Sequence, residues 1–205
     1  QHVQGKHNKE DTENKYAHIV GNGTSSSEGK VGGVVGGIDS GKVINVYNSG
    51  EVIATQTSYV GGITGECYAE LSNAQNTGSV TGNGYVGGVT GYSTGTIKNS
   101  YNTGSVTGTT NSGIVLGWTN VTSSENLYYL SSLSGNAVGT YAVRPDDQPT
   151  LEAQIIGKTE LEIKSQTFVD LLNTNKSGID GAVNWKLDSK TGYPVLDFTV
   201  TLEEN

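Results

Sequence analysis

The chain is poor in several residue types, and each shortage excludes a class of protein. Of 205 residues, one is a cysteine, Cys67, and none is a methionine. A single cysteine excludes an internal disulfide framework and a cysteine-based metal cluster. No apolar stretch approaches the roughly 18 residues that span a bilayer, so we expect no membrane insertion. Because the chain opens at Gln1 and lacks methionine, we expect a fragment or processed product of a longer protein.

Positive charge is also scarce. The chain has 12 Lys and Arg against 20 Asp and Glu, which gives a net charge of −8. Between residues 31 and 130 the basic side chains are Lys42 and Lys98 alone. Proteins that bind nucleic acid neutralise its phosphates with clustered Lys and Arg. Nucleic acid and anionic membrane surfaces are therefore excluded as expected partners.

Glycine is in excess, with 30 residues, and its spacing reveals a repeat. One signature appears as VGGVVGG at 31–37, VGGITG at 60–65, VGGVTG at 86–91 and, altered, as GIVLG at 113–117. A second appears as NVYNSGEV at 45–52, NAQNTGSV at 73–80, NSYNTGSV at 99–106 and, altered, as NLYYL at 126–130. The two signatures alternate, so the chain contains four copies of a unit of about 27 residues.

The repeat unit predicts the fold. Glycine and β-branched residues fill its interior, and apolar positions do not recur at helical spacing, which excludes a helix. Stacked copies of a short β unit bury a continuous core and pair the backbone of each coil with the next. We predict a mainly all-β chain whose residues 31–130 form a parallel β-solenoid of about four coils. Residues 1–30 form an N-terminal segment, and residues 131–205 a small α+β C-terminal cap.

Two sets of repeated residues have predicted structural roles. Asn45, Asn73, Asn99 and Asn126 recur at matching positions, where their amides are expected to form a hydrogen-bonded ladder along the stack. Gly50, Gly78 and Gly104 follow Asn-Ser or Asn-Thr, the composition of a turn with a positive φ.

The two signatures together resemble a known motif. VGG(V/I)xG followed by NxYNxGxV at this period is similar to the GLUG motif, which occurs in repeat arrays of large bacterial surface and secreted proteins. The resemblance covers residues 31–130. Residues 126–198 are similar, less specifically, to the segment that closes such arrays. The resemblance implies an extracellular location and a role in attachment or display, and it implies no reaction.

The first thirty residues carry a different resemblance. The stretches HVQGKHN and KYAHIVGNGT resemble the end of the head-type β-roll of trimeric autotransporter adhesins and phage tail fibres. This implies a homotrimer of intertwined chains on a cell surface or a virion. The alternative is an N-terminal coil that covers the first solenoid turn. His2, His7 and His18 also lie here, but none has a second ligand at metal spacing, so no metal is expected.

The C-terminal residues predict a helix and a hairpin. Thr159 and Glu162 have capping-box spacing, so a helix is expected to begin there and to end near Asn173. The apolar residues between Trp185 and Phe198 predict a strand pair around the turn DSKTG. We expect this unit to cover the last coil, because an open solenoid edge would pair with other chains.

Residues with reactive side chains are few. Glu66 and Glu70 flank Cys67, and a carboxylate pair of this kind could serve glycoside hydrolysis. No histidine accompanies the cysteine in its repeat, so we interpret Cys67 as an apolar filler and the carboxylates as turn or surface charges. The glycine segments lack the Lys-Ser/Thr ending of a phosphate-binding loop. We therefore expect no enzyme, no cofactor and no metal.

Four aromatic residues are the candidate binding residues. Tyr92 and Trp118 directly follow the last glycine of the first signature, and Tyr59 and Tyr85 directly precede its VGG. Rows of aromatic side chains on a regular surface suit sugars or partner proteins. The alternative is that these rings pack within the stack or against the cap.

The predicted function is a non-enzymatic extracellular adhesion or receptor-binding module on a bacterial surface protein or a phage tail fibre. Its partner would be a host or bacterial surface glycan or protein. A structural spacer is the first alternative. A polysaccharide-cleaving enzyme is the second, because solenoids carry many activities.

Overall fold

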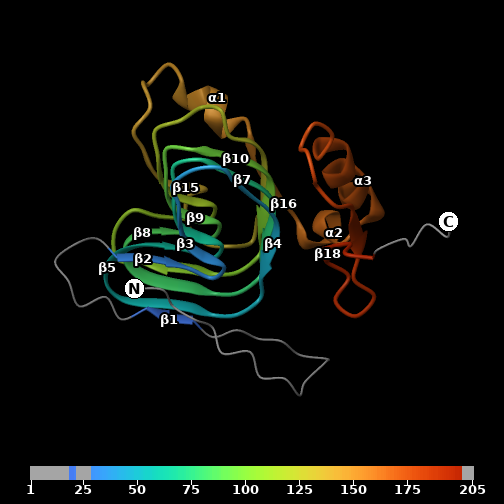
Figure 1. Ribbon diagram of the computed structural model, residues 1–205, viewed down its shortest axis with the longest axis horizontal. Coiled ribbons are helices and arrows are strands. Elements are labelled where there is room, and N and C mark those ends of the chain that lie inside the picture. The colour runs from blue at the N-terminus through green and yellow to red at the C-terminus, as the bar shows by residue number, and fades with distance from the viewer. Residues whose placement is uncertain (1–18, 22–28, 200–205) are drawn as a thin grey trace.

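The structure is a computed structural model that describes residues 19–21 and 29–199, and these residues are mainly β. Figure 1 shows the chain passing through successive coils that lie over one another as nested loops, with a helical unit beside them. The strands of each coil pair in parallel with those of its neighbours. The predicted parallel β-solenoid with a small α+β cap is therefore confirmed.

Each full coil contributes to three parallel sheets in turn. Sheet A contains β1 (Ile19–Gly21), β2 (Gly29–Gly32), β5 (Val52–Gly61), β8 (Val80–Gly87), β11 (Val106–Gly108) and β12 (Ser112–Gly113). Sheet B contains β3 (Val35–Ile38), β6 (Thr64–Cys67), β9 (Thr90–Ser93), β13 (Leu116–Thr119) and β15 (Val138–Tyr141). Sheet C contains β4 (Lys42–Asn48), β7 (Glu70–Asn76), β10 (Thr96–Asn102), β14 (Glu125–Leu130) and β16 (Ile155–Lys158).

The stack has about five rungs, one more than the four predicted. The fifth consists of β15 and β16, which pair in parallel with β13 and β14. These strands lack both repeat signatures, because a terminal rung needs backbone hydrogen bonds to only one neighbour and has no further coil to match. They lie within residues 131–205, the range assigned to the cap. Helix α1 (Gln148–Glu152) connects them and buries Leu151 against the core.

An amide ladder that the sequence analysis did not identify runs through the solenoid. The second asparagine of each NxxN pair is buried, and its amide joins the next rung. Asn48 Nδ2 donates to Asn76 Oδ1 at 2.9 Å, and Asn76 Nδ2 donates to Asn102 Oδ1 at 2.8 Å. Each Nδ2 also donates to the carbonyl of the glycine two residues later at 2.8 Å. This interior ladder fixes the turn that leads out of sheet C.

The predicted ladder of Asn45, Asn73, Asn99 and Asn126 lies on the outer side of sheet C. Asn73 Nδ2 donates to Asn45 Oδ1 at 2.8 Å, and Asn99 Nδ2 donates to Asn73 Oδ1 at 2.9 Å. No donor among the described residues reaches Asn99 Oδ1, so the hydrogen-bonded series stops one rung before Asn126. The two ladders point in opposite directions, because the interior amides donate toward later rungs and the outer amides toward earlier ones.

The positive φ expected near the turn glycines falls on asparagine instead. The four outer-ladder asparagines have φ between 43° and 57°, whereas Gly50, Gly78 and Gly104 are not in that region. Asparagine tolerates this conformation better than most residues. The glycines are required by stacking distance. A Cβ at Gly78 would lie 1.9 Å from the Gly50 carbonyl oxygen, and a Cβ at Gly104 would lie 1.9 Å from that of Gly78.

The cap lies along the side of sheet C, as Figure 1 shows, and does not cover the last coil. The outer amides bind its backbone on three rungs: Asn45 Nδ2 to Gly181 O at 2.7 Å, Asn73 Nδ2 to Val183 O at 3.1 Å and Asn99 Nδ2 to Leu172 O at 3.0 Å. The buried indole of Trp185 donates to Asn73 Oδ1 at 2.6 Å. The prediction that this unit covers the last coil is therefore wrong, because the amides that bind its backbone lie on the outer side of sheet C.

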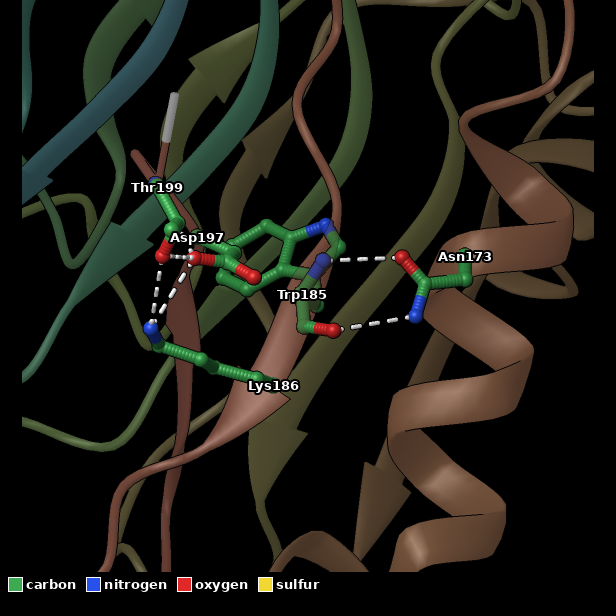
Figure 2. A network of polar contacts seen from close by, with 5 residues as sticks. All are labelled: Asn173, Trp185, Lys186, Asp197 and Thr199. Atoms are coloured by element: carbon green, nitrogen blue, oxygen red, sulfur yellow. Dashed lines mark hydrogen bonds and ion pairs between the residues drawn. The ribbon is translucent and has the colours of Figure 1, made fainter. Parts of the chain in front are cut away.

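The single helix predicted from Thr159 is two helices, α2 (Glu160–Ile163) and α3 (Gln166–Asn175). Thr159 and Glu162 do form the capping box. Ser165 then takes an extended conformation and caps α3 through Phe168 N, which interrupts the first helix. Figure 2 shows how Asn173 of α3 exchanges two hydrogen bonds, at 2.8 and 3.0 Å, with the backbone of Trp185.

The predicted strand pair is the antiparallel hairpin of β17 (Trp185–Leu187) and β18 (Pro194–Leu196). Figure 2 also shows that Lys186 on β17 bonds Asp197 at 2.9 Å, beside Thr199. Phe168, Leu172 and the indole of Trp185 pack with Tyr101 and Tyr128 of sheet C, so the cap shares a core with the solenoid wall. In the part of the chain that the structure describes, no helix is long and apolar enough to cross a membrane.

We expect Gly104→Ala to lower the free energy of unfolding by about 3 kcal/mol, because its Cβ would overlap the Gly78 carbonyl of the adjacent rung. Urea denaturation followed by circular dichroism measures this change. Ser105→Ala, an exposed neighbour, is the control and should change stability little. Equal stability of the two variants would show that the turn glycines are not fixed by stacking.

Candidate functional site

The candidate binding residues lie at the corner where sheets A and B approach each other. The chain turns between these sheets at the Gly-Gly pairs, and glycine in sheet B lets the two backbones come together. A Cβ at Gly91 would lie 2.4 Å from Val60 N, and a Cβ at Gly65 would lie 2.6 Å from Tyr59 O. Side chains beside these glycines therefore meet across the corner.

Strand register arranges these side chains in two columns. The first column lies on successive rungs of sheet A and consists of Lys30, Tyr59, Tyr85 and Asn111. The first three are in register with one another, and Asn111 directly precedes Ser112, which is in register with Val86. Successive rungs of sheet B, beginning one rung later, carry Glu66, Tyr92, Trp118 and Thr140. We call these eight residues the corner strip.

Each sheet A residue of the corner strip contacts the sheet B residue of the next rung, which makes four diagonal pairs, and Tyr85 also contacts Tyr92 of its own rung. The four pairs differ in chemistry: an ion pair of Lys30 with Glu66, stacked rings of Tyr59 and Tyr92, an edge contact of Tyr85 with Trp118, and a hydrogen bond from Thr140 to Asn111. The repeat thus builds one continuous surface feature from residues of neighbouring coils.

The four predicted binding residues, Tyr59, Tyr85, Tyr92 and Trp118, form a single cluster, which we call the aromatic ridge. Tyr59 and Tyr92 stack with centroids 4.6 Å apart and planes at 17°, and Tyr92 and Trp118 stack at 4.3 Å and 3°. Tyr85 meets both Tyr92 and Trp118 edge-on, at 6.0 and 6.4 Å. All four side chains are half-buried.

This geometry decides which part of each ring a partner can reach. Both faces of Tyr92 are covered, one by Tyr59 and the other by Trp118. The rings therefore pack against one another within the stack, which was one predicted arrangement. They also lie side by side along one surface, which was the other. Ring edges, rather than faces, are what the middle of the ridge offers a partner.

A buried carboxylate lies at the start of the strip. The Glu66 side chain is 2% exposed and pairs with Lys30, which also lies 3.7 Å from Asp39. The hydrogen bond from Lys30 to Glu66 raises the pKa of Lys30. A hydrogen bond between Tyr68 and Glu66, together with slight burial, raises the pKa of Tyr68 to about 12. Tyr68 is half-exposed and meets Tyr92 edge-on at 6.2 Å, so it extends the ridge.

The polar members of the strip were not predicted as binding residues, and Glu66, interpreted as a turn or surface charge, is buried. Lys30 directly precedes the first signature, as Tyr59 and Tyr85 do, and Asn111 precedes Ser112, which is in register with Val86. Glu66 and Thr140 follow a glycine, as Tyr92 and Trp118 do. Alignment of all the repeats by their glycines, without a search for aromatic residues, would have found them.

The residues considered for catalysis are separated. Cys67 is fully buried in the core, where burial raises the pKa of its thiol to about 11. Glu66 pairs with Lys30, whereas Glu70 accepts a hydrogen bond from Ser72 at 2.7 Å. Within residues 19–21 and 29–199, no three His, Cys, Asp or Glu side chains are grouped as metal ligands. His2, His7 and His18 lie outside the described residues.

Comparison with known proteins supports the repeat and the fold. Residues 82–107 match the sequence profile of the family described as the GLUG motif. This match contains the VGGVTG and NSYNTGSV segments, so the resemblance in the repeats is confirmed there. No curated protein matches the chain. The resemblance of residues 1–30 to trimeric adhesin heads and tail fibres stays a prediction.

A solved structure shares the fold. It is a crystal structure described as a "putative immunoglobulin A1 protease" from Bacteroides ovatus, with a TM-score of 0.57 and 18% sequence identity. The similarity covers 90% of this chain and 56% of that one, so this chain spans little more than half the length of its structural neighbour. At this identity the likeness concerns the fold alone.

We expect Lys30→Met to lower the free energy of unfolding by about 2 kcal/mol, because Glu66 would stay buried without its cation. The matched control is Lys98→Met, since Lys98 lies 3.9 Å from a half-exposed Glu125 and should matter little. Chemical denaturation measures both variants. The double variant Lys30→Met/Glu66→Gln should recover part of the loss, and no difference between the single variants would contradict a structural ion pair at the corner.

Proposed function

We propose that this chain is a non-enzymatic, extracellular recognition module that binds a surface glycan or protein through the aromatic ridge. The observation that carries the proposal is the assembly of Tyr59, Tyr85, Tyr92 and Trp118, from four different strands, into one half-buried cluster. Aromatic side chains supply large contact areas at low cost in conformational entropy. Their concentration at one corner supports the proposal that this corner is the binding surface.

The extracellular location rests on the matched GLUG motif, whose resemblance implies bacterial surface and secreted proteins. The acidic, lysine-poor composition supports neutral or protein partners over nucleic acid. Display on a phage fibre and trimerisation depend on the N-terminal resemblance and are the part of the proposal that needs an independent test.

A hydrolytic function is the weaker candidate. The structural neighbour is described as a protease, but fold likeness at this identity does not carry an activity. Nucleophilic catalysis needs a base within hydrogen-bond reach of the nucleophile. Among the described residues, Cys67 has a backbone carbonyl, that of Ala69, as its hydrogen-bond partner at 3.6 Å, and it is closed off from solvent.

The ridge can be tested with the double variant Tyr92→Ala/Trp118→Ala. The 205-residue chain would be screened against arrayed glycans, collagen, fibronectin and cultured epithelial cells. We expect the double variant to bind at least about tenfold more weakly, because the ridge loses two of its three stacked rings. Tyr47→Ala is the matched control, since Tyr47 is 53% exposed on β4 of sheet C, outside the ridge.

Thermal unfolding followed by circular dichroism separates loss of binding from loss of structure. Unchanged binding by a folded double variant would remove the ridge from consideration. Absence of binding to every probe by the unsubstituted chain would favour the spacer function, which predicts tolerance of an added or deleted repeat.

A further inference from the structure

The aromatic column of sheet B ends one rung before the stack does. Tyr92 and Trp118 are in register, and the next residue of the column is Thr140 on β15. Tyr92 covers one face of Trp118, and Thr140 lies on the side of the opposite face. The position that a third ring of this column would occupy therefore holds a small polar side chain.

A threonine covers little of an indole. Its side chain extends by one bond beyond Cβ, whereas the indole extends across two fused rings. The outer part of the Trp118 ring is thus left without a stacking partner in rung five. Tyr85 contacts the indole edge-on, and Tyr92 stacks on its other face. This prearranged aromatic face differs from that of Tyr92, which is covered on both sides.

Two polar groups border the vacant position. Thr140 Oγ1 donates to Asn111 Oδ1 at 2.7 Å, which orients the asparagine amide at the corner. Asn111 is exposed and Thr140 is half-buried. An aromatic face combined with a few oriented polar groups is the usual composition of a site that holds a ligand in one orientation.

We propose that the uncovered face of Trp118, with Asn111 and Thr140, is a subsite for one ring of a neutral sugar. The inference rests on the proposed recognition function and specifies its ligand. The C–H face of a pyranose is attracted to the negative face of an aromatic ring. Its hydroxyl groups would then exchange hydrogen bonds with the Asn111 amide and the Thr140 hydroxyl.

Charge favours a neutral sugar over an anionic one. The chain has a net charge of −8, and the cation of the corner strip, Lys30, is neutralised by Glu66 and Asp39. A sialylated or sulfated glycan would find no uncompensated cation in the strip. A protein ligand would instead contact ring edges along the whole ridge.

The decisive variant is Thr140→Tyr, which places a ring of the protein's own in the vacant position. The added ring should stack on Trp118 as Trp118 stacks on Tyr92, so the fold is kept while the subsite is filled. Thr107→Tyr, at an exposed threonine of sheet A outside the strip, is the matched control. Asn111→Gly is a second test, because glycine removes the amide and accepts the positive φ of 44° at this position.

The chain has two tryptophans, so its indole N–H signals in an NMR spectrum can be assigned with Trp118→Phe. Lactose, maltose, cellobiose and chitobiose are the probes. We expect at least one to shift the Trp118 signal, while Trp185, buried and bonded to Asn73, stays unchanged as an internal reference. Thr140→Tyr should raise the dissociation constant by about tenfold or more, and Thr107→Tyr should not.

The outcomes separate the two proposals. No shift of the Trp118 signal with any of the four sugars overturns the subsite. The subsite is also overturned if a sugar or protein probe needs the ridge for binding but binds Thr140→Tyr and Asn111→Gly as well as the unsubstituted chain. In that case the recognition function still stands. Loss of sugar binding in Thr140→Tyr but not in Thr107→Tyr, with unchanged thermal stability of both variants, supports the sugar subsite.

Discussion

The solenoid depends on the contact between the interior asparagine ladder and the Gly-Gly turns. A Cβ at Gly62 would lie 2.4 Å from the Asn76 side chain and 2.2 Å from the Gly88 carbonyl oxygen. Gly88 stands in the same relation to Asn102, and Gly33 to Asn48. The buried amides need complete hydrogen bonding, because an unpaired polar group inside a core is costly. The glycines provide the space in which those hydrogen bonds form.

This contact explains why the two repeat signatures end together. In the fourth repeat Ile114 stands where Gly62 and Gly88 stand in earlier repeats, and Tyr129 stands where Asn76 and Asn102 stand. The last ladder amide, Asn102, donates instead to the Ile114 carbonyl at 2.8 Å. Beyond this point apolar packing around Leu127, Val138 and Leu151 replaces the amide ladder.

Sequence predicted the repeating coils and local elements of the cap, such as the capping box at Thr159 and the hairpin, but not how these parts pack together. Periodic glycines and asparagines indicated the solenoid, and the positions of Tyr92 and Trp118 beside them indicated the ridge. The fifth rung carries no such period, because backbone pairing of β16 with β14 places no demand on side chains. The side position of the cap depends on single long-range contacts, such as that of Trp185 with Asn73. The diagonal offset at the corner depends on strand register, so the pairing of Lys30 with Glu66 had no local signal.

The diagonal offset gives the corner a combinatorial character. Every sheet A residue of the corner strip contacts a sheet B residue of the following coil, in addition to the contact of Tyr85 with Tyr92 inside one coil. The core of every coil is nearly interchangeable, but the surface at the corner depends on the order of the coils. Recombination that reshuffles, duplicates or removes whole repeats would therefore keep the scaffold and create new neighbour pairs. Such an array can acquire new surface chemistry by rearranging units, without a single point mutation.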